Sequence, residues 1–127
     1  MQEQLLDKQR GAPLRVFAVW YAMYPGDARG RWRRDLLTDD RVMHWWDERR
    51  LLGRQVLSQL RPYSRLRAPG SRDFQEKVLW DAYLLFDRKA RWDQSPTGLV
   101  SWGYTVMTTR KTLAEQVGRL VQPERAR

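Results

Sequence analysis

Short apolar runs separated by long polar connections make up this chain. The first run, at 16–21, is β-branched or aromatic at most positions and is followed by Pro25-Gly26. This pattern is typical of a strand that enters a loop, and it predicts a strand at about 14–21. The residues before the strand favour helix and stop at Gly11-Ala12-Pro13, so we expect a helix at about 2–10.

The middle of the chain is predicted to be helical. Apolar residues recur there at near-helical spacing, at Val42, Trp45, Trp46, Leu52, Val56 and Leu60. Residues 38–40 supply a Thr for the N-cap and two Asp for the first turn, where negative charge favours a helix. We therefore expect a helix at about 39–60, which Gly53 and the charged run at 47–50 could divide into two pieces.

Two further strands follow a basic segment, 61–77, which is expected to be a loop outside the core because it is polar and contains Pro and Gly. Residues 78–86, VLWDAYLLF, are apolar on both faces, as in a strand that is covered on both sides. Residues 99–107 predict another strand, with Gly103 indicating a bulge or close packing. The polar connection between these strands predicts an antiparallel hairpin with a long loop at 87–98.

A final helix is predicted at about 109–121. Its apolar stripe consists of Leu113, Val117, Leu120 and Val121. Either Thr108 or Thr109 would cap it, and the tail at 122–127 should fray. The order is therefore α-β-α-β-β-α, which predicts a single α/β domain over residues 1–127.

Composition excludes several classes of chemistry. The 127 residues contain no cysteine, so this polypeptide alone forms no disulfide, no Cys-ligated metal site and no thiol nucleophile. A single histidine, His44, excludes multi-histidine metal sites, and we expect no metal and no cofactor. No apolar run approaches the ~18 residues of a membrane span, and the N-terminus lacks the apolar region of a secretory signal. We expect a cytoplasmic protein without a membrane partner.

The charge suggests an anionic partner without identifying one. The chain has 24 Lys and Arg against 15 Asp and Glu, a net charge of +9. Cations interleave with an aromatic ring at Arg29, Arg31, Trp32, Arg33 and Arg34. Such a cluster can hold phosphates and stack bases, or it can be a solvated loop whose Arg side chains stack on Trp. Because basic residues also recur elsewhere along the chain, nucleic-acid binding is the less favoured alternative.

Other candidate site residues each have a structural interpretation. Asp81, inside an apolar strand, is either a buried acid with a raised pKa or, as we favour, the partner of an Arg or of a hydrogen bond at a strand end. His44 is expected to be a packing or surface residue. Trp20, Trp80 and Trp102 should pack in the core, whereas Tyr24 and Trp92, in loops, suit a partner surface. The candidate binding residues are Tyr24, Asp27, Arg29, Arg31, Trp32, Asp81 and Trp92.

Four segments together resemble a bacterial family of thioredoxin-like proteins. They are VFAVWYAMYPGDARGRW at 16–32, LLTDDRVMHWWDE at 36–48, VLWDAYLLFDRKARWD at 78–93 and SPTGLVSWGYTV at 95–106, about half of the chain. The resemblance implies a thioredoxin-like fold whose first strand is missing. In that family a central strand runs into a Cys-x-x-Cys at the start of the first helix. Here the helix at 2–10 would match the rest of that helix, and the cysteines would lie before Met1.

The resemblance also implies that the dithiol site is absent. The family has a proline, usually cis, before the third strand, and the matching position here is near Lys77. We therefore expect a cysteine-free thioredoxin-like domain with a binding or scaffold role and no redox activity of its own. The alternatives are a fragment of a thiol-disulfide oxidoreductase and a small basic nucleic-acid-binding protein. Because the missing strand would lie between 14–21 and 78–86, these strands should pair directly or bind a strand of another chain, so the expected partners are a protein or a second copy.

Overall fold

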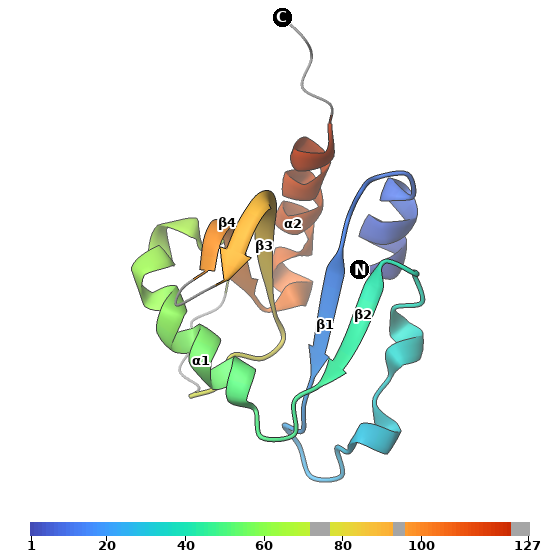
Figure 1. Cartoon of the computed structure of the whole chain (residues 1–127), viewed down its shortest axis with the longest axis vertical. Coiled ribbons are helices and arrows are strands. Elements are labelled where there is room, and N and C mark those ends of the chain that lie inside the picture. Colours follow the sequence, from blue (N-terminus) through green and yellow to red (C-terminus); the bar gives the residue numbers. More distant parts are fainter. Residues whose placement is uncertain (72–76, 93–95, 123–127) are drawn as a thin grey trace, which may run out of the picture. The chain divides into compact units, whose positions relative to one another are not determined.

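The computed structural model describes residues 1–71, 77–92 and 96–122. These residues form the mixed α/β structure that the sequence predicted, and its strands make two small sheets (Figure 1). The chain divides into two compact units, Met1–Leu52 and Gly53–Arg127, and each unit is described here by itself.

The first unit contains a parallel pair of strands. β1 (Val16–Trp20) confirms the strand predicted at 14–21, and it pairs with β2 (Val42–Trp46) along its whole length (Figure 1). The prediction of one helix over 39–60 is therefore wrong. Residues of β2 alternate between half-buried and exposed, which is the period of a strand, and three of the five are Val or Trp, which favour strands.

Helix α1 (Leu51–Leu60) is the only part of the predicted middle helix that forms as a helix. Its N-terminus is capped by Asp47, whose carboxylate accepts hydrogen bonds from the backbone N–H of Leu51 at 3.0 Å and of Leu52 at 2.8 Å. The cap is thus not Thr38, and residues 39 and 40 precede a strand. The charged run at 47–50 separates β2 from α1, the division that the sequence left open.

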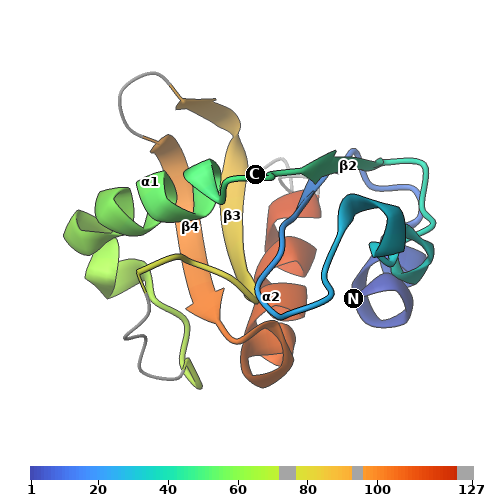
Figure 2. The ribbon, with the colours of Figure 1, turned by 90° about the horizontal axis from the view of Figure 1, so that it is seen from below.

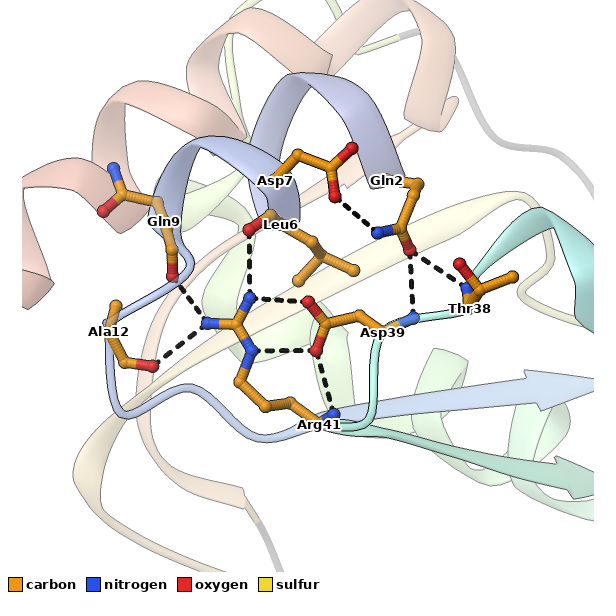
Figure 3. A network of polar contacts seen from close by, with 8 residues as sticks. All are labelled: Gln2, Leu6, Asp7, Gln9, Ala12, Thr38, Asp39 and Arg41. Atoms are coloured by element: carbon orange, nitrogen blue, oxygen red, sulfur yellow. Dashed lines mark hydrogen bonds and ion pairs between the residues drawn. The ribbon is translucent and has the colours of Figure 1, made fainter.

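The predicted N-terminal helix is confirmed as helical, although it is a π-turn over Gln2–Leu6 followed by a 3₁₀ turn over Asp7–Gln9. Arg41, immediately before β2, binds the C-terminal end of this N-terminal helical segment (Figure 3). The Arg41 guanidinium donates to the carbonyls of Leu6, Gln9 and Ala12 at 2.6–3.0 Å. It also forms a bidentate ion pair with Asp39, so each of its five N–H groups has an acceptor.

The second unit is built on the predicted antiparallel hairpin. β3 (Ala82–Trp92) pairs with β4 (Pro96–Tyr104) (Figure 2). The pairing confirms the prediction, but the bounds differ from 78–86 and 99–107. Val78 and Leu79 are buried ahead of the strand rather than in it. Most of the loop expected at 87–98 is strand, and residues 93–95 lie outside the described residues.

The hairpin has two different faces. Leu84 and Trp102, opposite each other in the ladder, pack with Val56 and Leu60 of α1. On the other face Ser101 is buried, and its hydroxyl donates to the side chain of Gln116 on α2 (Val106–Val121). The alternation of side chains along a strand places one helix against each face.

Helix α2 begins earlier than predicted. Thr105 is its N-cap, and its hydroxyl and that of Thr108 bond each other's backbone N–H in a capping box. Thr108 and Thr109 are therefore inside the helix, and Thr109 is fully buried. Gly103 is closely packed, as expected, because an added Cβ would lie 2.7 Å from the ring of Tyr83. Of the expected frayed tail, residues 123–127 lie outside the described residues.

Two other expectations need correction. The segment 61–77 is not wholly outside the core, because Ala68 is buried and its N–H donates to the carbonyl of Trp102 at 2.8 Å. Residues 72–76 lie outside the described residues. Direct pairing of 14–21 with 78–86 is not among the strand pairs of the described residues, where β1 pairs with β2 and β3 with β4. Self-association by strand pairing stays a prediction.

Candidate functional site

The loop that follows β1 begins with a turn built by Asp27. The Asp27 carboxylate accepts hydrogen bonds from the backbone N–H of Met23 at 2.9 Å and of Tyr24 at 2.8 Å. These bonds hold the pKa of Asp27 below its usual range because they favour the charged form. The predicted site residue Asp27 is thus engaged by its own backbone, and the turn leaves the Tyr24 side chain 62% exposed.

Trp32 is the centre of the candidate site. Two 3₁₀ turns, Arg29–Arg31 and Arg34–Leu36, flank it in the chain. They bring the guanidinium of Arg34 to 4.8 Å and that of Arg29 to 5.9 Å from the centre of the Trp32 ring. Both distances are those of cation–π contacts. Because the turns fix both cations against one ring, the positive charge of this loop is held in place.

The Trp32 ring also packs against β2. It meets the ring of Trp46 edge-on at 5.9 Å and the ring of His44 at 6.4 Å. The sequence did not predict this packing because its pattern placed both His44 and Trp46 on a helix. The signal that could have found it is the short run VMHWW, rich in Val and Trp, because a strand there puts side chains two residues apart on the same face.

His44 is a packing residue, as expected, although it lies on a strand. Its Nδ1 accepts a hydrogen bond from the indole N–H of Trp20 at 3.0 Å, and its Nε2 lies 3.0 Å from the carbonyl of Leu37. This arrangement requires the tautomer that carries hydrogen on Nε2, which donates to the carbonyl. Since both ring nitrogens have partners, His44 positions Trp20 and the loop rather than serving as a base.

Three arginines of the loop have no carboxylate partner in the described residues. Arg33 pairs with Asp35 at 3.0 Å, an exposed pair in which Arg33 lowers the pKa of Asp35. The other ion pair of the described residues joins Arg41 and Asp39. The three remaining arginines of the loop are exposed and Trp32 is half-buried, and we define these four residues as the cationic surface: Arg29, Arg31, Trp32 and Arg34.

Asp81 and Trp92 belong to the second unit. Asp81 is not inside a strand: it precedes β3, is exposed and has φ 48. Its backbone carbonyl accepts a hydrogen bond from the N–H of Val106 at 2.9 Å. Partial burial raises the pKa of Asp81, against the lowering effect of the same N–H. The described ion pairs do not include it, so the expected Arg partner is not found, whereas a bond at a strand end is.

Of the three tryptophans expected to pack in the core, one is buried. Trp102 is buried, and Trp20 and Trp80 are half-buried. Trp92 is 40% exposed, but it lies at the end of β3 rather than in a loop, with its ring 5.8 Å from that of Phe86.

Comparisons with protein-family models, with curated proteins and with solved structures all ended without a match. Within the described residues, no three acidic or histidine side chains are grouped as they would be to hold a metal ion. None of the described helices has both the length and the apolarity that crossing a membrane requires. The candidate site therefore rests on its geometry alone.

Proposed function

We propose that this chain is a binding domain, without dithiol chemistry of its own, that binds an acidic segment of a partner protein. The cationic surface carries this proposal, because its three exposed arginines have no carboxylate partner in the described residues and two of them, Arg29 and Arg34, lie against one indole ring.

Arginine suits this role for geometric reasons. Its planar guanidinium donates two parallel hydrogen bonds to one carboxylate, which lysine cannot do. Stacking on Trp32 fixes Arg29 and Arg34 before a ligand arrives, and groups that are already ordered lose less entropy on binding. The net charge of +9 would also speed the encounter with an acidic partner.

The thioredoxin-like relationship is part of the same proposal. It is supported by the order of a helical segment, β1, α1, the β3–β4 hairpin and α2, which agrees with the order that the resemblance implies. β2 is an addition to that order. A thioredoxin-like domain without cysteine has lost the thiolate on which disulfide exchange depends, and its remaining function would be to hold a partner.

The test is binding of a glutamate-rich peptide to the whole chain, measured by fluorescence anisotropy at several salt concentrations. We expect Arg29→Gln/Arg34→Gln to weaken binding at least about tenfold, since each charge-assisted hydrogen bond contributes roughly 1.5–3 kcal/mol. The matched control is Arg15→Gln/Arg49→Gln, which removes the same charge from exposed positions of the same unit. Equal weakening by both pairs would mean that net charge, rather than this surface, holds the peptide.

A further inference from the structure

The β3–β4 hairpin contains a large bulge. Phe86 lies opposite Leu99, and the next pair along the ladder is Arg91 with Thr97. Residues 87–90 of β3 therefore face Gly98 alone on β4. A bulge of this kind redirects side chains away from the sheet.

Specific contacts build the bulge. The Asp87 carboxylate accepts a hydrogen bond from the backbone N–H of Lys89 at 2.8 Å, which closes a turn. Gly98 has φ +75, and a Cβ there would lie 2.7 Å from Asp87 Oδ1 and 2.9 Å from Ala90 Cα. Only glycine fits beneath the turn. Thr97 closes the other side, because its hydroxyl bonds both the N–H and the carbonyl of Arg91.

Three exposed cations lie in or next to the bulge, and an aromatic residue follows them in the chain. Arg88, Lys89 and Arg91 are exposed, and neither ion pair of the described residues involves them. Asp87, which precedes the three cations, accepts a backbone N–H with its carboxylate, and Asp93 lies outside the described residues. Trp92 follows directly, 40% exposed and supported by the ring of Phe86.

We propose that this bulge binds single-stranded nucleic acid, with the three cations at successive phosphates and Trp92 stacked on a base. Cations along a strand next to an exposed ring are the two elements that single-strand binding combines. An acidic peptide would use the cations but offers no base to stack on Trp92. An anionic membrane would need several apolar side chains, and in the described part of the bulge Trp92 is the only large exposed apolar one. This site lies in the second unit and takes a different class of ligand from the proposed function.

The test uses the whole chain and an oligothymidylate of roughly 16 nucleotides, with affinity measured over a range of salt. For single strands the logarithm of the affinity changes by about 0.7 per phosphate contact for each decade of salt, which corresponds to about fivefold per contact near 0.1 M. Arg88→Gln/Lys89→Gln should thus weaken binding about 25-fold and reduce the salt slope by about 1.4. Trp92→Leu should weaken binding without changing the slope.

The matched control is Arg110→Gln/Lys111→Gln, which removes an exposed Arg and Lys from α2 of the same unit. Its affinity should stay within about twofold of the unaltered chain, and so should that of Arg29→Gln/Arg34→Gln, which separates this site from the cationic surface. Circular dichroism melting checks that each variant is folded. Equal weakening by the bulge pair and the control pair would overturn the proposal. So would an unchanged affinity in Trp92→Leu, or tighter binding to polyglutamate or phosphatidylserine vesicles with the same dependence on Arg88 and Lys89.

Discussion

Many aspartates of this chain serve its own backbone. Asp27, Asp39, Asp47 and Asp87 each accept a hydrogen bond from a backbone N–H between two and five residues away. Such local bonds are what short acidic side chains make in turns and at helix starts. Asp39 also pairs with Arg41, whereas neither ion pair of the described residues includes the other three aspartates, so these carboxylates serve the backbone and do not neutralise an arginine there.

The pair that Asp39 forms with Arg41 makes the stability of the fold depend on pH. Hydrogen bonds with Arg41 lower the pKa of Asp39 from 3.8 to about 2. A group whose pKa is lower in the folded state stabilises the fold above its ordinary pKa, and that stabilisation is lost as the pH falls towards the folded value. We expect the difference in melting temperature between the unaltered chain and Asp39→Asn to shrink between about pH 4 and pH 2. Asp40→Asn, a neighbouring exposed position, is the control, and a pH-independent difference for Asp39→Asn would contradict the assignment.

The sequence predicted the role of a residue correctly where that role depends on neighbouring residues in the chain. Close packing of Gly103 and burial of Trp102 follow from their places in an apolar strand. The roles of Arg41 and Trp46 were not predictable, since their partners lie far along the chain. Asp81 was misplaced because alternation of apolar residues does not show where a strand starts, and its positive φ ends the extended backbone just before β3.

At the scale of elements, β2 shows how periodicity can mislead. Apolar residues of a strand and of the following helix together gave a spacing close to 3.6. The composition of β2 favours a strand, but the aspartates before it imitate a helix start. The hairpin and α2 were predicted correctly in kind because each has its own long apolar pattern, and only their bounds moved.

The start of α1 can be tested directly. Asp47→Ala removes acceptors from two backbone N–H groups and should lower the free energy of unfolding by about 1 kcal/mol. Asp47→Asn should retain most of that stability, because its side-chain oxygen can also cap. Asp40→Ala is the control, and urea unfolding should place it within about 0.5 kcal/mol of the unaltered chain. If Asp40→Ala lowered the free energy of unfolding more than Asp47→Ala does, the assignment of Asp47 as the cap would be wrong.

At the scale of the whole molecule, composition limits the chemistry more firmly than the fold does. The chain has no cysteine, so it has no thiolate to attack a disulfide. We expect the pure chain to show no insulin-reduction turnover above that of dithiothreitol alone. Turnover that persists after purification to homogeneity would require a nucleophile that the sequence does not contain.

The network in Figure 3 has a consequence for how the first unit opens. The Gln2 side chain accepts hydrogen bonds from the N–H of Thr38 at 3.0 Å and of Asp39 at 3.2 Å, while Arg41 binds carbonyls of the N-terminal segment. Each segment thus supplies partners for the other's backbone. In hydrogen–deuterium exchange these amides should belong to one cooperative unit, so that loosening the first two residues also releases the start of β2.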